Sequence, residues 1–440
     1  MALKSISAET GRAALHSLLR EGSPLGPLKV MAQQIGRFFQ IPIPGFRPFV
    51  VFGPEANRKI LVTERKKVLW RNNDPVTDLL RHGVLVTDGE EHDRYRKLME
   101  PSLHPSQLQE YAQTMVEQTD RVSSRWKDGE TVDMLVEARE IALLIIMQAL
   151  FSKDVSNDLP HIWTPILKAI KYISPGMWIF WRRMPRLGFK KHLKVLDDYL
   201  FGIIEERRKR KEGENDLLQH LIDAGLSDDV IRDQILTMLI AGHDTSTALL
   251  AWTFALLGQH PDIHSRLVEE VDSLDRSPLL EQVIKESLRL YPPIHIGNRQ
   301  VVEKMEFSDG NVPAGERMFY SIYLTHRDPN IWENADDFCP DRFAHGRKTP
   351  PFSYVPFGGG PRACIGAAFG QAETRAVIAR LLHTHRFEFT NHRIHAHMGA
   401  TLEPRPGVRM RVSRRNPTSP DVGPDLELST TGVVGLPETK

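Results

Sequence analysis

The sequence predicts a mainly α-helical protein with a small β lobe. Apolar residues recur at helical spacing over long stretches, which favours helices over strands there. Shorter runs rich in β-branched and aromatic residues lie outside those stretches and predict strands. We expect the helical lobe mostly in residues 75–290 and 364–384, and the β lobe mostly in residues 40–70, 294–320 and 385–413.

The chain of 440 residues shows no internal repeat and no change of composition before its last stretch. We therefore expect one domain over residues 1–413. After Arg415 the sequence is rich in Pro, Ser, Thr and Gly and poor in large apolar residues, which predicts a disordered tail over residues 414–440.

Composition excludes several functional classes. The formal net charge of +1 lacks the basic excess of a nucleic-acid-binding protein. Two cysteines cannot form a disulfide framework, so a reducing compartment, the cytoplasm, is expected. The longest apolar run, residues 141–151, contains Gln148 and is shorter than the ~18 residues of a membrane-spanning helix. That run predicts a core helix, and with no signal-peptide core in the first 22 residues we expect a soluble protein without a membrane anchor.

Individual elements follow from local signals. Residues 48–63, PFVVFGPEANRKILVT, contain a β-rich run, a Gly-Pro turn, a helical stretch and a second short apolar run. Residues 227–260 hold the longest helical pattern, with Ser227 as N-cap and a terminating His-Pro pair. At ~1.5 Å per residue such a helix spans about 50 Å and would cross the domain. Residues 311–353 are rich in Pro, Asp and aromatics, which predicts irregular structure, and residues 405–412 predict a late strand.

Residues 357–366, FGGGPRACIG, contain Cys364, one of the two cysteines. Three consecutive glycines permit turn conformations that a Cβ would forbid, so the chain can lie flat against a large ligand. Phe357 offers an apolar surface beside the sulfur, and Arg362 places a positive charge two residues before it. Because a thiolate requires a metal or a nearby positive charge, this setting predicts a metal ligand rather than a cysteine buried for packing alone.

The pattern Phe-x-x-Gly-x-Arg-x-Cys-x-Gly resembles the haem-thiolate signature of the cytochrome P-450 family, with every fixed position filled. Such a coincidence is expected by chance in roughly one of ten thousand sequences. The resemblance extends over about residues 49–412 and implies the cytochrome P-450 fold, with the long central helix over haem b. It implies a monooxygenase in which Cys364 is the axial ligand of the haem iron. The other cofactor contacts that it implies in this loop are Phe357, Gly358, Arg362 and Gly366.

The segment AGHDTST lies in the middle of the long helical pattern. Gly242 is costly in a helix interior, and its missing side chain would let a flat cofactor approach. The segment resembles the family's acid-alcohol motif, which implies that Asp244 and Thr245 are catalytic and deliver protons to dioxygen, while Ala241 and Gly242 line the cofactor. The alternative is that the Thr245 hydroxyl bonds to the carbonyl of Ala241 and only bends the helix. We expect His243 to face solvent or a neighbouring residue.

The segment EQVIKESLRLYPP places Glu286 and Arg289 three residues apart on one helix face, where they can pair. The resemblance implies that both join Arg342 in a buried structural triad on the cysteine side of the haem. The alternative is an exposed helical ion pair.

Four basic side chains are candidate partners of the haem propionates. Arg362 lies in the cysteine loop, and the resemblance sends Arg299 to the cofactor from the strand after the two prolines. His92 and Arg96 are four residues apart and share a helix face, and they resemble the family's His/Trp-x-x-x-Arg pair. Each alone would be an ordinary surface charge, and the resemblance assigns all four to the haem.

The resemblance also implies which segments line the substrate pocket: residues 76–86, 294–296 and 400–402, and the central helix before Gly242. These segments are largely aliphatic, which predicts a hydrophobic substrate such as a fatty acid, terpenoid, steroid or polyketide. With O₂ as co-substrate, one oxygen atom would be inserted into this substrate by hydroxylation or epoxidation. His295 is either a polar contact in this pocket or a partner of a neighbouring carbonyl.

The sequence contains no GxGxxG fingerprint, flavin-binding segment or iron–sulfur cysteine cluster, so a separate electron donor is implied, a ferredoxin with its reductase or a flavodoxin. We expect it to dock on a basic patch on the cysteine side, formed by Arg94, Lys97, Arg347 and Lys348. Residues 177–194 mix aromatic and basic side chains, which fits a substrate-entrance lid, a peripheral membrane contact or ordinary core packing. We expect a monomer that binds no nucleic acid.

Two other functions stay open. A haem-thiolate peroxygenase or isomerase that uses peroxide would not need the Asp244 and Thr245 pair. A non-catalytic haem-binding sensor, with the tail as its interaction segment, would not need it either. The intact pair therefore favours the monooxygenase.

Overall fold

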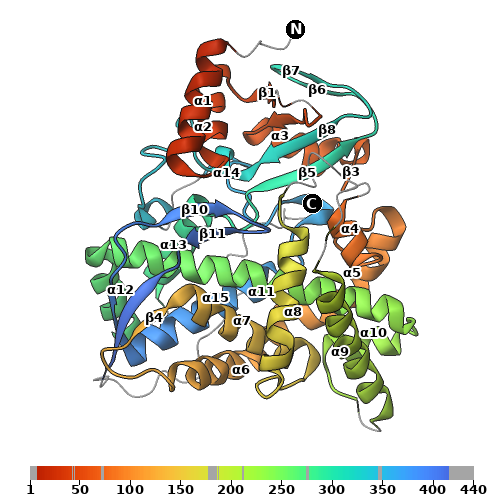
Figure 1. Ribbon diagram of the computed structural model, residues 1–440, viewed down its shortest axis with the longest axis vertical. Coiled ribbons are helices and arrows are strands. Elements are labelled where there is room, and N and C mark those ends of the chain that lie inside the picture. Colours follow the sequence, from red (N-terminus) through yellow and green to blue (C-terminus); the bar gives the residue numbers. More distant parts are fainter. Residues whose placement is uncertain are drawn as a thin grey trace.

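The computed structural model describes residues 7–41, 43, 45–70, 74–176, 186, 188–210, 213–273, 277–344 and 349–415. Helices dominate this part of the chain, and the short strands gather mainly at one end, beside the first two helices (Figure 1). This arrangement confirms the expected mainly helical class with a small β lobe.

The long helix α11 (Asp228–Gln259) runs through the centre of the helical lobe. Ser227 is its N-cap and accepts from the backbone N–H of Val230, while two aspartates in the first turn suit the positive end of the helix dipole. The helix lies within one residue of the predicted bounds at each end. It packs against α7 (Met134–Phe151), α9 (Lys190–Lys209), α13 (Pro278–Leu290) and α15 (Ala367–Thr384).

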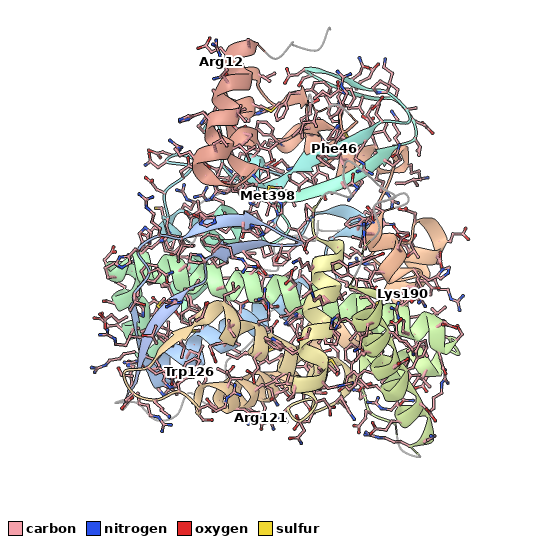
Figure 2. The ribbon with its side chains drawn as sticks, viewed as in Figure 1. Arg12, Phe46, Arg121, Trp126, Lys190 and Met398 are labelled. Atoms are coloured by element: carbon pink, nitrogen blue, oxygen red, sulfur yellow. The ribbon has the colours of Figure 1, made fainter. Side chains whose placement is uncertain are left out.

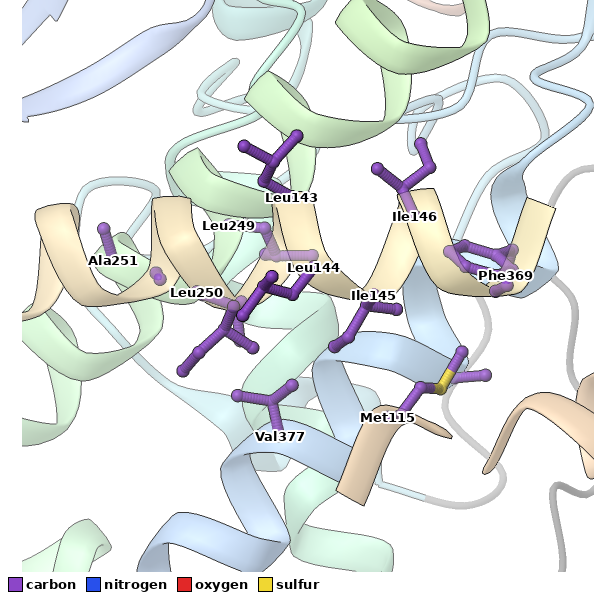
Figure 3. Packing of buried hydrophobic residues seen from close by; sticks show 14 of the residues in the cluster. Met115, Leu143, Leu144, Ile145, Ile146, Leu249, Leu250, Ala251, Phe369 and Val377 are labelled. Atoms are coloured by element: carbon purple, nitrogen blue, oxygen red, sulfur yellow. The ribbon is translucent and has the colours of Figure 1, made fainter. Parts of the chain in front are cut away.

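The main hydrophobic core lies between α7, α11, α15 and α6 (Pro105–Ser123). Figure 3 shows Leu144 and Ile145 of α7 among Leu250 of α11, Val377 of α15 and Met115 of α6. Residues 141–151 lie wholly within α7 and are almost completely buried, as the predicted core helix requires. The remaining helices of this lobe are α4 (Pro75–Leu80), α5 (Gly89–Leu103), α8 (Leu159–Ile173), α10 (Leu217–Asp223) and α12 (Pro261–Ser273).

The β lobe is built on a five-stranded sheet in the order β1-β2-β8-β5-β3. Strands β2 and β8 are parallel, with Val50 opposite Phe319, and the other neighbours are antiparallel. The hairpin of β6 and β7 extends from the same lobe (Figure 1). The strands are β1 (Phe38–Gln40), β2 (Phe49–Val51), β3 (Val68–Leu69), β5 (Ile296–Val301), β6 (Met305–Phe307), β7 (Gly310–Val312) and β8 (Arg317–Ser321).

Two smaller sheets use the last described segments. Strands β4 (Thr131–Asp133), β12 (Arg409–Arg414) and β9 (His385–Phe389) form one sheet, and β10 (His395–Met398) pairs with β11 (Leu402–Arg405). Strand β11 lies against α11, because the indole N–H of Trp252 donates to the Leu402 carbonyl at 2.8 Å. Figure 2 shows Met398 of β10 between the β lobe and the helical lobe. This hairpin therefore reaches the interior beside the central helix.

Some local predictions are wrong. Residues 311–353 were expected to be irregular, although residues up to 320 were also placed in the β lobe. Strand β8, which lies inside the main sheet, agrees with the second expectation, while β8 and the short helix α14 (Ile322–Thr325) contradict the first. The second apolar run of residues 48–63 continues the helix α3 (Pro54–Arg58) as a π-helical turn, Lys59–Thr63. The late strand begins only at Arg409, after a Pro-Gly break. Helices α1 (Ala8–Glu21) and α2 (Leu25–Ile35) were not predicted.

Several predictions lie wholly or partly outside the described residues. They concern the tail after Arg415 and most of residues 177–194. The single-domain bounds stay a prediction. Among the helices that the structure describes, none is long and apolar enough to cross a membrane.

Candidate active site

The loop around Cys364 is fixed by its own backbone and by the π-helical turn. A 3₁₀ turn, Gly360–Arg362, leads through the cysteine into α15, and the Cys364 N–H donates to the Phe357 carbonyl at 2.8 Å. Gly358 and Gly360 have φ values of 72° and 63°, which side chains rarely adopt. A Cβ on Gly360 would lie 2.3 Å from the Leu61 carbonyl oxygen. The missing side chain of Gly360 therefore makes room for the protein's own backbone and not for a ligand.

The Cys364 side chain is exposed, although burial raises the pKa of its thiol. We infer that the sulfur borders open space that the surrounding protein encloses. Phe357 and Gly358 are partly exposed in the same loop, and nothing lies within 4 Å of where a Cβ of Gly366 would stand. A thiol in this setting ionises only if a cation such as a metal is supplied.

One stripe of α11 also faces open space inside the protein. Between residues 231 and 257 every residue of this helix is buried except Ala241, Gly242 and Thr245. These three positions share a helix face. Because the helix lies in the interior, we infer that the stripe lines a cavity. The missing side chain of Gly242 also serves helix packing, since a Cβ there would stand 2.2 Å from Ile146 of α7.

Helix α15 places the cysteine loop close to this stripe. The helix begins three residues after Cys364, and its Glu373 accepts a hydrogen bond from Ser246, which follows Thr245 on α11. A Cβ on Gly370, one turn into α15, would lie 4.0 Å from the Ser246 hydroxyl. The sulfur lies just before α15 and the stripe lies on α11, and these two helices touch, as two walls of one cavity would.

The Thr245 hydroxyl donates to the Ala241 carbonyl at 2.6 Å. This is the bond that the structural alternative required. It uses the hydroxyl proton but leaves the oxygen lone pairs free to accept. Because Thr245 is partly exposed on the cavity stripe, its hydroxyl can accept a hydrogen bond from a bound molecule there.

Asp244 is buried on another side of α11. One carboxylate oxygen, Oδ2, accepts from the Thr401 hydroxyl at 2.8 Å, and the other, Oδ1, lies 3.9 Å from an Nη2 nitrogen of Arg139 without a hydrogen bond. Burial raises the pKa of Asp244 to about 6, and the nearby Glu403 adds to the rise. Asp244 and Thr245 therefore adjoin along the chain but contact different partners.

His243 faces a neighbouring residue and not solvent, so the solvent-facing alternative is wrong. Its Nε2 lies 3.0 Å from the Arg139 carbonyl oxygen. Burial lowers the pKa of His243 to about 3, which keeps the ring neutral.

The four predicted basic residues gather beside the cysteine loop. Arg362 donates to Asp88 at 2.6 Å and to the Thr87 carbonyl, and Arg96 donates to the Ala363 carbonyl at 2.6 Å. Arg299 and Arg362 lie 4.2 and 5.5 Å from the ring centroid of Trp70. Burial lowers the pKa of His92, and the positive charges of Arg362 and Arg96 lower it further. These two arginines therefore lie within electrostatic range of His92.

Three arginines and the neutral His92 of this cluster face three carboxylates. Asp88 accepts from Arg362, Asp93 lies 2.8 Å from the His92 ring, and Glu100 lies 3.5 Å from Arg96. The buried Arg299 is the member to which the described residues offer no carboxylate, since it donates to the Asn298 carbonyl and the Tyr320 hydroxyl. A carboxylate of a ligand would pair with this arginine. Together with the exposed sulfur of Cys364, this donor set fits haem b.

Glu286, Arg289 and Arg342 form a buried cluster, so the alternative of an exposed helical ion pair is wrong. Arg289 holds both carboxylate oxygens of Glu286, at 2.7 and 2.9 Å, and Arg342 donates to Glu286 at 2.9 Å. Glu286 and Arg289 are fully buried, and Arg289 also donates to the carbonyls of His326, Ala335 and Asp337.

Two of the segments predicted to line the substrate pocket, residues 76–86 and 400–402, contact α11. The backbone N–H groups of His82 and Val84 donate to Asp233 and Gln234 of α11 at 3.1 and 2.8 Å. The turn before β11 is joined to the end of α8, since the Ala400 N–H donates to the Ser174 hydroxyl. His295 is buried with its Nδ1 3.4 Å from the Pro293 carbonyl, and burial lowers its pKa to about 4.

Sequence reasoning missed four residues of this region: Trp70, Arg139, Thr401 and Glu403. Trp70 stands under two guanidinium groups, and the other three surround Asp244. Arg139 and Thr401 are far from Asp244 in the chain, so no local spacing could have found them. The one available signal was that Thr401 falls in a predicted pocket segment.

Comparisons with known proteins agree with this geometry. The family model described as Cytochrome P-450 matches residues 15–407. The chain is 29% identical over 365 residues to pentalenene oxygenase of Streptomyces avermitilis, covering 76% of this chain and 80% of that protein. It is 28% identical over 402 residues to cyclooctatin synthase of Streptomyces melanosporofaciens, covering 83% and 86%. A solved cyanobacterial structure with bound retinoic acid superposes with a TM-score of 0.82 at 25% identity, covering 91% of this chain and 96% of that one.

Proposed function

Because this chain belongs to the cytochrome P-450 family, it is a monooxygenase that carries haem b, and we propose that Cys364 binds the haem iron. The observation that supports this assignment is the sulfur that is accessible and yet enclosed by protein. Bound iron would supply the positive charge that holds a buried sulfur as a thiolate. Haem, when bound, supplies the redox chemistry by which one atom of O₂ enters the substrate and the other leaves as water.

The protein's own residues would then hold the haem, orient a molecule bound beside it, and exchange protons. Arg96, Arg299, Arg362 and His92 would hold the haem propionates. The buried Arg299 supports this assignment, because it has no carboxylate partner among the described residues. On the opposite wall the Thr245 hydroxyl accepts a hydrogen bond from a molecule in the cavity, while Ala241 and Gly242 leave it room. Asp244, with a pKa of about 6, can exchange a proton close to neutral pH.

We place the substrate among terpenoid hydrocarbons and alcohols. The related proteins are named as oxygenases of pentalenene and of cyclooctat-9-en-7-ol, and the solved relative holds retinoic acid. The predicted pocket segments are largely aliphatic, and the buried His295 is neutral and tied to a backbone carbonyl. Such a wall selects by shape and apolar area rather than by hydrogen bonds.

The test of this function is spectroscopic and then catalytic. We expect the reduced protein with carbon monoxide to give the absorption band of a thiolate-bound haem. We expect cyclic terpenes to change the spin state of the ferric protein more strongly than fatty acids or steroids do. Turnover should require a reduced ferredoxin or flavodoxin and O₂, and should be poor with hydrogen peroxide alone. A carbon monoxide band at the position of a histidine-bound haem would contradict the proposal.

We also propose that an acidic electron donor docks beside α5. Arg94 and Lys97 of this helix are exposed, while the other two residues of the predicted patch, Arg347 and Lys348, lie outside the described residues. Reversing both charges (Arg94→Glu with Lys97→Glu) should slow reduction by an acidic ferredoxin about tenfold at low salt, because electrostatic steering raises association rates. The difference should shrink as salt is added.

The matched control is Arg12→Glu on α1, which Figure 2 shows at the far end of the molecule. It changes surface charge without touching α5 and should leave the reduction rate unchanged. Equal slowing in both proteins, or a slowing of the α5 variant that ignores salt, would rule out this docking surface.

A further inference from the structure

The carboxylate of Asp244 is enclosed by residues of strand β11 and helix α7. Thr401, the residue before β11, is 3% exposed, and its hydroxyl donates a hydrogen bond to Asp244 at 2.8 Å. This is the one hydrogen bond to the Asp244 carboxylate that the described residues make, and Oδ1 is buried without one. The proton affinity of Asp244 therefore depends on a residue of the β10–β11 hairpin.

Arg139 of α7 lies between two carboxylates. Its Nη2 contacts Glu403 of β11 directly and stands 3.9 Å from Asp244. Glu403 is 6% exposed, and the half-exposed Arg405 also donates to it at 2.9 Å. The Arg139 guanidinium therefore interacts mainly with the Glu403 carboxylate. Its interaction with Asp244 is weaker, because the distance is longer.

We propose that Thr401 and Glu403, both in the β10–β11 hairpin, are positioning residues that set the protonation state of Asp244 in opposite directions. The Thr401 hydroxyl favours the carboxylate form, because a donated hydrogen bond stabilises the negative charge. Glu403 favours the protonated form through its own negative charge and by drawing Arg139 away. The hairpin therefore poises this acid for proton exchange near neutral pH. The role rests on the proposed part of Asp244 in proton delivery.

The polar groups that face Asp244 come from two neighbouring elements. Helix α7 contributes Arg139, and the β10–β11 hairpin contributes Thr401, Glu403 and Arg405. On α11 itself His243 precedes Asp244 and is neutral, since burial lowers its pKa to about 3. On β10 His397 stands opposite Glu403, and burial lowers its pKa as well. A pH response near 6 is therefore not that of His243, and its loss in Asp244→Asn distinguishes Asp244 from His397.

The first test replaces the hydroxyl of Thr401. In the holoenzyme, the infrared band of a protonated buried carboxyl that is missing in Asp244→Asn reports the titration of Asp244. Thr401→Val should move the midpoint of this band upward by about one pH unit, because hydrogen bonds to charged groups are strong. Thr401→Ser keeps the hydroxyl and should restore the original midpoint. The limb of the turnover–pH profile that disappears in Asp244→Asn should move the same way.

The second test removes the negative charge of Glu403. Glu403→Gln frees Arg139 for Asp244 and should move the same midpoint downward by about one pH unit. A purely structural role of the hairpin would not move the two variants in opposite directions. Unchanged midpoints in Thr401→Val and Glu403→Gln, or shifts of the same sign, would overturn the proposal.

The two proposals fail in different ways. A carbon monoxide spectrum without the thiolate band would reject the role of Cys364, while the carboxyl titration would still report on Asp244. A normal spectrum with fixed midpoints in both β11 variants would reject only the inference about Thr401 and Glu403.

Discussion

Replacing Cys364 by serine is expected to abolish turnover while leaving the fold intact. The Cys364 thiol is exposed, yet burial raises its pKa, so only a bound cation holds it as a thiolate. A serine hydroxyl is far harder to ionise and cannot donate charge to the iron as a thiolate does. The backbone N–H at this position would still donate to the Phe357 carbonyl, so the loop should keep its shape.

The carbon monoxide difference spectrum of the reduced protein measures this change, and circular dichroism checks the fold. We expect the thiolate band to disappear in Cys364→Ser, with helix content unchanged. Cys339→Ser is the matched control, because Cys339 is the other cysteine of the chain and is half-buried. Its backbone N–H donates to Glu286 at 2.8 Å, a bond that serine retains. A thiolate band that survives in Cys364→Ser and is lost in Cys339→Ser would show that Cys339, and not Cys364, binds the iron.

The parts of the site that lie close together in the chain could be predicted from the sequence. The cysteine loop and the AGHDTST segment are both local patterns, and α11 has its N-cap and its end where the residues place them. Caps, glycines and helical periodicity act within a few residues, so they can be read without tertiary contacts. The pairing of Glu286 with Arg289 belongs to the same class, since three residues on a helix make one turn.

Contacts between distant segments could not be predicted in this way. Thr401 meets Asp244 only because β11 crosses α11, and strand β4 exists only because it pairs with β12. In helix α1 Thr10 and Ser17 are buried while Leu15 and Leu19 are exposed. The hydrophobic pattern of this helix therefore predicts the wrong buried face. Strand β8 falls at the end of the predicted β-lobe range 294–320 but also in a region whose proline and aspartate content predicted irregular structure. Its position between β2 and β5 outweighs that composition.

Removing Arg289 should destabilise the protein more than any change at its surface. Arg289 is fully buried, and its guanidinium satisfies both oxygens of the equally buried Glu286. Arg289→Met keeps much of the volume but leaves the Glu286 charge with only Arg342 and one backbone N–H, that of Cys339. Breaking a buried ion pair on one side costs about 3–5 kcal/mol. The three carbonyls that Arg289 also serves lose their donor, which adds to the loss.

The free energy of unfolding, from denaturant titration of the holoenzyme, measures this effect. Lys194→Met on α9 is the comparison, because Lys194 pairs with Asp198 one turn away on an exposed helix surface. Exposed pairs of this kind contribute only about 0.3–0.5 kcal/mol. The two variants therefore differ in burial while both replace one cation of a helical ion pair by methionine.

A double variant separates the buried charge from the packing. In Arg289→Met with Glu286→Gln the uncompensated carboxylate is gone, so the protein should regain part of the stability that Arg289→Met alone loses. If the charge of Glu286 is the main cost, the double variant is more stable than the single one. If the double variant is less stable by the full sum of the two single losses, the lost carbonyl contacts and packing dominate. In that case the Glu286 and Arg289 pair stabilises the cysteine side through Arg289's hydrogen bonds to the backbone rather than through its charge.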